Sequence, residues 1–328
     1  MSAPLSPSPL AVNGGPLGCS MGLVLAGVLA CAGPVHAAIP AGSSCKVPLV
    51  LMHGMSGFEQ IGSVGYFYGV RDDLTAQGYL VFATEVDPFN SVARRAEQAA
   101  LQIDRILADT GAPAVHLIAH SQGGLDARYL VSRLGYGDRV LTLTTLSTPH
   151  HGTRLADAAL GYLPDFAADP GPVLQFLDRL SSRATSTEVN LDAQLADLSS
   201  RGVETEFNPA TPDDPRVRYY SYAGYTQASP FVDHARVDLV NPALLVSYLA
   251  LDSLAGPNDG LVTITSAHWG TFLGVLPADH WDEIGQPLGV TGRAFDHLQF
   301  YRGLAQFLAG WTPPPAYPYA DQILSHLP

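Results

Sequence analysis

A serine flanked by small residues lies near the middle of the chain, directly after an apolar run. Residues 115–118 lead into Ala119-His120-Ser121-Gln122-Gly123-Gly124, a pattern typical of a strand that turns sharply into a helix and leaves a serine hydroxyl exposed. Small neighbours are needed because the turn brings backbone segments too close for larger side chains. An ordinary strand-to-helix turn can give the same short string. Ser121 is therefore a candidate nucleophile whose assignment depends on its partners.

A second apolar run, residues 48–52, ends in a glycine-containing loop that begins His53-Gly54-Met55. Backbone N–H groups in such a loop can stabilise the negatively charged oxygen that forms when a nucleophile attacks an ester carbonyl. We expect the N–H groups of Met55 and of Gln122, the residue after the serine, to form this oxyanion hole. A plain glycine-rich turn is the alternative, but such a turn would not by itself predict an acid and a base downstream.

An acid and a base follow the serine in the order Ser, Asp, His. Asp259 lies in Pro257-Asn258-Asp259-Gly260, and His280 follows Asp279. We expect His280 to take the proton from Ser121 as general base, and Asp259 to stay ionised while it orients the imidazole. Among the 11 histidines, His268 is the competing candidate for the base because it also follows Asp259.

The elements that must position these residues alternate along the chain. Helix 92–109 places its apolar residues on one face, as packing on a sheet requires. Strand–helix alternation predicts an α/β fold with a mostly parallel sheet flanked by helices. The predicted strands lie near residues 48–52, 79–84, 114–118, 139–146, 216–223 and 261–265, and the predicted helices near 68–77, 92–109, 122–134 and 294–309.

The chain resembles the secreted bacterial true lipases of the Pseudomonas and Burkholderia type, which are α/β-hydrolases. The resemblance covers most of residues 47–310 and rests on the joint order and spacing of several motifs. It implies an α/β-hydrolase fold, a triad of Ser121, Asp259 and His280, and an oxyanion hole of Met55 and Gln122. The motifs are His53-Gly54-Met55, Arg95-Ala96-Glu97-Gln98, His120-Ser121-Gln122-Gly123-Gly124-Leu125, Ser147-Thr148-Pro149-His150, Tyr219-Tyr220-Ser221-Tyr222-Ala223-Gly224, Asn258-Asp259-Gly260-Leu261-Val262, and His280 with Asp282, Glu283 and Gln286.

Arg95 matches a family arginine that braces the oxyanion loop. A solvated charge on the helix explains this residue equally well.

Many relatives also have a disulfide near the acid loop, where this chain has Thr265 and Ser266 and no cysteine after Cys45.

The resemblance further implies one structural Ca²⁺ ion beside the histidine loop. Asp282 matches a carboxylate ligand, while Gln286 and Val290 match positions that contribute backbone carbonyl oxygens. The second family carboxylate falls at Asn241, so Asp238 is the nearest carboxylate that could replace it. Loss of one negative ligand is expected to weaken calcium binding, and Asp282 as a plain loop acid is the alternative.

Residues 153–215 interrupt the strand–helix alternation. This polar, loop-rich stretch is expected to form a lid or cap inserted into a hydrolase domain of residues 38–310. Apolar residues repeat at helical spacing over 173–180, so a lid helix that opens at a lipid interface is one interpretation and a simple packing helix the other. Residues 311–328 are expected to form a Pro-rich C-terminal tail.

Residues 1–37 are predicted to be a leader that is removed on export. An apolar stretch over 21–31 precedes a small-residue cleavage site at Val35-His36-Ala37-Ala38. No Lys or Arg precedes it, so Met21 is an alternative start, and residues 28–31 weakly resemble a lipoprotein box. Export through the periplasm would leave Cys45 as a lone thiol, and the family resemblance adds a membrane-anchored foldase as folding partner.

Composition narrows the possible partners. Charged residues make up 14% of the chain and the net charge is −13, which argues against nucleic acid or an anionic membrane as partner. The combined prediction is a secreted serine carboxylester hydrolase, a triacylglycerol lipase acting on lipid or other acyl esters through an acyl-enzyme and without an organic cofactor. The alternatives are an esterase of short-chain esters, an aliphatic polyester depolymerase, and an inactive hydrolase-fold binding protein.

Overall fold

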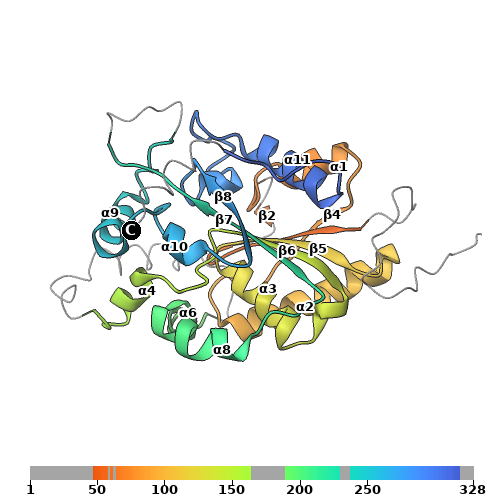
Figure 1. Cartoon of the computed structure of the whole chain (residues 1–328), viewed down its shortest axis with the longest axis horizontal. Coiled ribbons are helices and arrows are strands. Elements are labelled where there is room, and N and C mark those ends of the chain that lie inside the picture. The colour runs from red at the N-terminus through yellow and green to blue at the C-terminus, as the bar shows by residue number, and fades with distance from the viewer. Residues whose placement is uncertain (1–46, 58–59, 62–63, 164–188, 230–236, 318–328) are drawn as a thin grey trace, which may run out of the picture. The chain divides into compact units, whose positions relative to one another are not determined.

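Six strands form the central sheet of the computed structural model, which describes residues 47–57, 60–61, 64–163, 189–229 and 237–317. The sheet has the order β4-β1-β5-β6-β7-β8, and every neighbouring pair is parallel (Figure 1). The parallel sheet confirms the predicted α/β class. The strands are β1 (Leu49–Met52), β4 (Val81–Ala83), β5 (Val115–His120), β6 (Val140–Leu146), β7 (Arg218–Gly224) and β8 (Thr271–Leu276), and a separate antiparallel pair joins β2 (Gln60–Ile61) and β3 (Val64–Gly65).

Helices cover both faces of the sheet (Figure 1). Helices α1 (Val70–Ala76) and α11 (His297–Leu308) pack on one face, and α2 (Val92–Thr110) and α3 (Gln122–Ser132) on the other. Side chains alternate along β1, because successive strand residues point to opposite faces. Leu49 and Leu51 accordingly join the core beneath α1 and α11, whereas Val50 and Met52 join the core beneath α2 and α3.

Local signals fix the ends of the longest of these helices. The Ser91 side chain accepts the N–H of Arg94 at the start of α2, and Gly111 ends the helix in the left-handed conformation with φ 65°. A serine cap and a left-handed glycine satisfy backbone groups that the helix itself leaves unpaired. The residues that flank the predicted helix 92–109, Ser91 and Gly111, therefore determine where it begins and ends.

The predicted strand over residues 261–265 is wrong. Thr263 instead caps the short helix α10 (Ile264–Ala267), with its side chain accepting the N–H of Ser266. Val262 and Ile264 are buried in a small apolar cluster with Val275 of β8. Burial rather than strand pairing therefore accounts for the apolar residues here, and the last strand of the sheet is β8.

The described parts of the stretch between β6 and β7 contain several short helices joined by loops. The predicted amphipathic segment 173–180 lies outside the described residues, as does the predicted leader. Helix α9 (Leu245–Ala255) follows β7 and packs with α4 and α6 around Leu155, Leu195 and Leu251. The helices of the stretch are α4 (Arg154–Ala159), α6 (Leu191–Leu198), α7 (Ser200–Gly202) and α8 (Asn208–Ala210), with a π-helical turn over Val203–Phe207.

The chain after α11 returns to the sheet. The Tyr222 hydroxyl donates a hydrogen bond to the Pro315 carbonyl at 2.9 Å, and Tyr317 packs against Phe295. The described part of the predicted tail is thus in contact with the domain.

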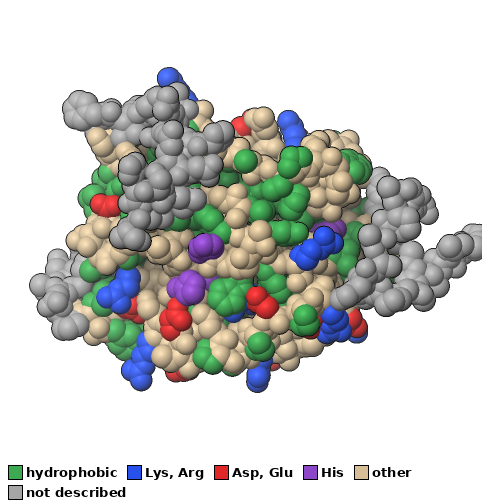
Figure 2. All heavy atoms as spheres, in the orientation of Figure 1, with side chains coloured by type: hydrophobic (Ala, Val, Ile, Leu, Met, Phe, Trp, Pro, Cys, Tyr) green, Lys and Arg blue, Asp and Glu red, His purple; other side chains and the backbone are tan. Residues whose placement is uncertain are grey.

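None of the helices in the described ranges is long and apolar enough to cross a membrane. Basic side chains lie scattered over the face seen in Figure 2 rather than gathered in one patch.

The start of α3 lies unusually close to β1. A Cβ atom on Gly123 would lie 2.6 Å from the Met52 carbonyl oxygen and 2.7 Å from that of His53. Both neighbours are backbone atoms of buried residues, Met52 at the end of β1 and His53 directly after it, so neither can move aside easily. A glycine at this position is therefore what allows α3, and the serine that precedes it, to sit against β1.

Gly123→Ala is expected to destabilise the fold by about 1–3 kcal/mol, the usual cost of overpacking a core. Thermal unfolding followed by circular dichroism measures the change. Gly303→Ala is the matched control, because a Cβ there meets only Pro315 in the C-terminal segment, at 3.0 Å, and alanine favours a helix. Equal melting temperatures for the two variants would contradict this account of Gly123.

Candidate active site

Ser121 occupies a strained turn between the central strand β5 and helix α3. Its backbone has φ 56° and ψ −133°, a conformation that non-glycine residues adopt only when the surrounding structure holds them there. The Ser121 N–H donates to the Leu146 carbonyl at 2.9 Å, and its carbonyl accepts the Thr148 hydroxyl at 2.7 Å. Neighbouring strand and loop thus hold the turn, and the side chain is partly exposed.

Asp259 and His280 form a buried hydrogen-bonded pair. His280 Nδ1 lies 2.7 Å from Asp259 Oδ2, and both side chains are almost fully buried. The other carboxylate oxygen of Asp259 accepts the N–H groups of Leu261 and Val262 at 2.8 and 2.7 Å. Three donors therefore fix the orientation of this acid.

His280 also lies beside the strained serine turn. Its ring centroid is 4.3 Å from that of His120, the residue before Ser121. His268, the competing candidate, is exposed and packs against Phe272 instead. The structure therefore brings His280, and not His268, together with Asp259 and the serine turn.

The loop after β1 touches the candidate nucleophile. A Cβ on Gly54 would lie 2.6 Å from the Ser121 Cβ, and Met55 and Ser121 line one pocket. Gln122 is the first residue of α3, so its N–H has no acceptor within the helix and lies at the positive end of the helix dipole. The two predicted oxyanion donors therefore flank the serine from different segments.

Arg95 braces this loop, so the interpretation as a solvated charge is wrong. Its side chain is fully buried, and Nη2 donates to the carbonyls of His53 at 2.8 Å and Gly54 at 3.2 Å. Nη1 donates to the Asp87 carbonyl at 2.6 Å, and Nε to Asp126 of α3 at 2.8 Å.

His53 adds a second brace. Its Nδ1 donates to the Gly54 carbonyl at 2.9 Å, and its Nε2 accepts the Val86 N–H at 3.1 Å. Burial, together with the charge of Arg95, lowers the pKa of His53 to about 3. The imidazole is therefore neutral, as one donating and one accepting nitrogen require.

An apolar pocket of about 40 Å³ opens beside Ser121. Its walls come from α4, α6 and the loop after Asp259. The lining residues are Met55, Ser121, Pro149, Thr153, Leu155, Ala156, Leu195, Leu198, Leu261 and Val262.

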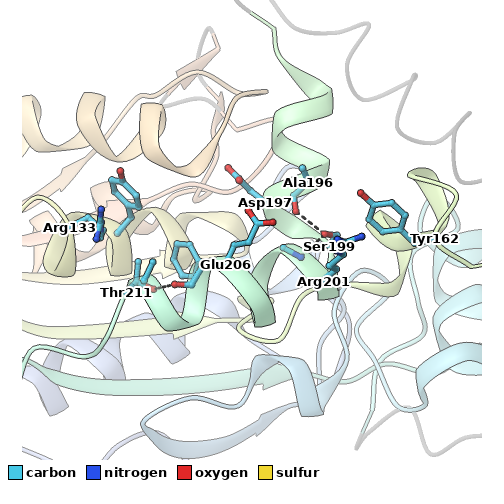
Figure 3. Close-up of a pocket in the computed structure, with 12 residues that line it drawn as sticks. Arg133, Tyr162, Ala196, Asp197, Ser199, Arg201, Glu206 and Thr211 are labelled. Atoms are coloured by element: carbon cyan, nitrogen blue, oxygen red, sulfur yellow. Dashed lines mark hydrogen bonds between the residues drawn. The ribbon is translucent and has the colours of Figure 1, made fainter.

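A larger pocket of about 460 Å³ lies between α3 and the segment α6 to α8 (Figure 3). Arg133 and Thr211 lie at one end of it and Arg201 and Tyr162 at the other. It contains none of the predicted site residues. The smaller pocket is therefore the candidate acyl site, because it alone of these two touches the candidate nucleophile.

A buried polar network behind the triad escaped sequence analysis. Tyr66 Oη lies 2.8 Å from His120 Nδ1, and His120 Nε2 lies 3.3 Å from Glu283. Ser147 donates to the other oxygen of Glu283 at 2.6 Å. Burial, and then the charge of Asp259, raises the pKa of Glu283 well above its usual range. Glu283 was visible in the sequence only as a motif residue, since its role depends on contacts between distant segments.

The carboxylates predicted as calcium ligands lie in buried surroundings. Asp282 and Asp238 are both buried, and burial together with the charges of Asp279 and Asp238 raises the pKa of Asp282 to about 8. The Asn241 side chain instead accepts the N–H of Ala243 in a turn. Asp279 and Asp238 are thus the carboxylates whose charges act on Asp282.

The other two predicted ligands lie on the same loop. The Gln286 side chain donates to the carbonyls of Gly65 and Tyr66, and Val290 is largely exposed. Within the described ranges, no cluster of three or more His, Cys, Asp or Glu side chains is arranged to hold a metal. A cation here would therefore depend on two carboxylates and backbone carbonyl oxygens.

Comparisons with known proteins agree with this architecture. Residues 47–282 match the family model for the alpha/beta hydrolase fold. The chain is similar to a triacylglycerol lipase of Vibrio cholerae, with 31% identity over 75% of this chain and 81% of the relative, and to one of Pseudomonas fragi, with 30% identity over 78% and 94%.

Solved structures show the same fold. A lipase of Bacillus licheniformis in its mature form superposes with a TM-score of 0.59 at 20% identity, covering 82% of this chain and 94% of that one. The lipase of Staphylococcus hyicus gives 0.58 at 21% identity, covering 83% and 97%. The resemblance stated from the motifs and the predicted enzyme class are thereby confirmed: the chain belongs to the α/β-hydrolase family, among its carboxylic ester hydrolases.

Proposed function

We propose that this protein is a serine carboxylester hydrolase, a triacylglycerol lipase that acts through an acyl-enzyme. The observation that carries the proposal is the buried Asp259–His280 pair beside the strained Ser121 turn. An unfavourable backbone conformation of this kind costs free energy, and such conformations are found mainly where a side chain must be held in one orientation for function. The triacylglycerol lipases among the relatives support the substrate class.

In the first half of the reaction, the Ser121 hydroxyl attacks the ester carbonyl and His280 takes its proton. The Asp259 carboxylate holds Nδ1 of His280, so Nε2 is the nitrogen that accepts the proton, and the negative charge of Asp259 stabilises the imidazolium. The negative charge that develops on the carbonyl oxygen is stabilised by the N–H groups of Met55 and Gln122. Collapse of the tetrahedral intermediate breaks the ester bond, and His280 returns the proton to the leaving alcohol.

In the second half, water attacks the acyl-enzyme with His280 again as base. The same two N–H groups stabilise the second tetrahedral intermediate. The carboxylic acid leaves and Ser121 regains its proton. Every proton moved in both steps passes through His280, which is why its orientation by Asp259 matters.

Export completes the proposal. The apolar stretch over 21–31 and the small-residue site around Ala37 support a secreted protein that passes through the periplasm. Resemblance to the Pseudomonas and Burkholderia type supports a membrane-anchored foldase as folding partner.

The small pocket favours a second candidate, an esterase of short-chain esters. Leu155, Leu195 and Leu198 enclose a volume of about 40 Å³ next to Ser121. A pocket narrowed by these leucine side chains favours a short acyl group. Both candidates share the same chemistry and differ in the acyl chain that they accept.

A structural calcium ion is also proposed at Asp238 and Asp282, with the carbonyl oxygens of Gln286 and Val290. Asp238 and Asp282 are both buried, and the charge of Asp238 is one cause of the raised pKa of Asp282. Buried carboxylates so close together are costly unless a cation neutralises them. Calcium prefers such oxygen ligands. The ion would hold the loop between Asp282 and Val290, and thereby the position of His280.

Ser121→Ala is expected to lower kcat for ester hydrolysis by about 10⁴-fold or more without loss of the fold. Hydrolysis of p-nitrophenyl butyrate, with circular dichroism of the purified variant, measures both. His280→Ala should be equally damaging, and His268→Ala should leave kcat near that of the wild type. An active, folded Ser121→Ala variant would exclude this nucleophile.

The pocket predicts a chain-length preference that one substitution should change. If the second candidate is right, wild-type enzyme hydrolyses p-nitrophenyl acetate and butyrate faster than the palmitate, and Leu198→Ala moves the optimum to longer chains because it enlarges the pocket. Emulsified triglyceride is assayed beside them. An optimum at palmitate in the wild type would contradict the short-chain esterase and favour the lipase.

Chelation is expected to lower the melting temperature, because an ion bound only by the native state stabilises it by RT ln(1 + [L]/Kd). At a calcium concentration about 100 times Kd this gives about 2.7 kcal/mol, or roughly 5–10 °C for a domain of this size. Asp282→Asn and Asp238→Asn should abolish the response to EDTA, and Asn241→Ala should retain it. Identical melting curves with EDTA and with excess calcium would show that the chain binds no such ion.

A further inference from the structure

Helix α6 contributes more to the candidate site than a pocket wall. Leu195 and Leu198 line the pocket beside Ser121. Gln194, the residue before Leu195, is fully buried. A buried amide must find hydrogen-bond partners. The partners of Gln194 Nε2 are Gln122, which carries one expected oxyanion donor, and Pro88, which hydrogen-bonds the loop that carries the other.

One partner is the residue after the nucleophile. Gln194 Nε2 donates to the side-chain oxygen of Gln122 at 2.5 Å. The Gln122 side chain in turn donates through its own Nε2 to the Asn90 carbonyl at 3.0 Å. Gln122 is also fully buried, so its side chain is held from two sides while its backbone N–H lies at the start of α3.

The other partner leads to the oxyanion loop. Gln194 Nε2 also approaches the Pro88 carbonyl at 3.4 Å, and the same carbonyl accepts the Ser56 N–H at 2.9 Å. Ser56 directly follows Met55, the other expected donor. Gln194 is therefore linked to both backbone segments that face the developing negative charge, through Gln122 on one side and Pro88 on the other.

We propose that Gln194 is a positioning residue that holds the oxyanion hole in its productive geometry. This inference rests on the proposed function. Oxyanion stabilisation depends on donors that are already oriented before the charge develops, and removal of one donor costs about 10²–10³-fold in kcat. Gln194 does not contact the reacting atoms; it fixes the segments that do.

The position of Gln194 also couples this hole to the acyl pocket. Because Leu195 and Leu198 lie on the same helix, a displacement of α6 would move the pocket wall and the amide together. A purely structural role is the alternative, in which Gln194 merely fills the interior. That role would affect the melting temperature and leave the transition state unaffected.

The test uses Gln194→Met, which keeps the volume of the side chain and removes its hydrogen bonds. With p-nitrophenyl butyrate, kcat is expected to fall about tenfold or more while KM stays within about twofold, since the interaction is made in the transition state. Affinity for a boronic acid, which forms a tetrahedral adduct with the serine, should fall by a similar factor. Gln102→Met is the matched control: Gln102 hydrogen-bonds the backbone of Glu85 through both its amide atoms, in a neighbouring loop, and its loss should leave kcat unchanged.

A double variant keeps the inference testable if the single variant does not fold. The double variant Gln122→Met with Gln194→Met removes both amides of this hydrogen bond. Neither leaves a buried polar side chain without its partner, and proteins tolerate this better than the loss of one amide alone. Its kcat should be no lower than that of Gln122→Met alone, because the two residues act as one unit. Independent, multiplying losses would overturn the coupling.

The remaining outcomes separate the two proposals. Wild-type kcat and wild-type boronic acid affinity in Gln194→Met would overturn the positioning role while the enzyme remains a serine hydrolase. Wild-type protein that neither hydrolyses the ester nor reacts with a fluorophosphonate would refute the proposed function itself, and this inference with it.

Discussion

The buried guanidinium of Arg95 is the interaction on which the geometry of the site depends. It joins the carbonyls of His53, Gly54 and Asp87 to the carboxylate of Asp126. A buried charge is tolerated only when its partners are in place, and removing one partner of such a pair is far more costly than losing an exposed ion pair. The loop after β1 therefore cannot leave Ser121 without breaking the contacts of a fully buried cation.

Much of the site could be predicted from the sequence because it is marked locally. Ser121 follows an apolar strand and has a small residue two positions before it and two positions after it. Asp259 and His280 follow in order, on loops at the edge where the carboxyl ends of the parallel strands meet. Arg95 illustrates the limit of that reading, since a charge on an amphipathic helix has the same local pattern whether it is exposed or buried. Only the fold decides between these two environments.

Contacts between distant segments account for what the sequence did not reveal. Gln194 lies in a helix whose local sequence gives no sign of this role, and its partners lie 72 and 106 residues away along the chain. The sequence left both Asn241 and Asp238 as candidate calcium ligands for a similar reason, because alignment to a local Asx-Pro pattern does not show which side chain turns inward. At residues 261–265, a threonine cap overrode the strand propensity of the apolar residues around it.

Two acids near the histidine illustrate how environment sets charge. Asp259 receives three hydrogen bonds, which fix its orientation toward His280. Glu283 is buried beside that charge and is driven toward its neutral form. Neighbouring carboxyl groups in one site thus have different roles because their surroundings differ.

Helix α6 is attached to the loop before α2 at several points, and this has a consequence for protein engineering. Besides the Gln194 contacts, the Asn190 N–H donates to the Phe89 carbonyl, and Asp197 accepts the N–H of Val92. The stretch between β6 and β7 is therefore not an exchangeable module. A chimaera can import this stretch from a relative in order to alter acyl preference. It should then import the segment 87–92 as well, because the two segments are joined by these hydrogen bonds.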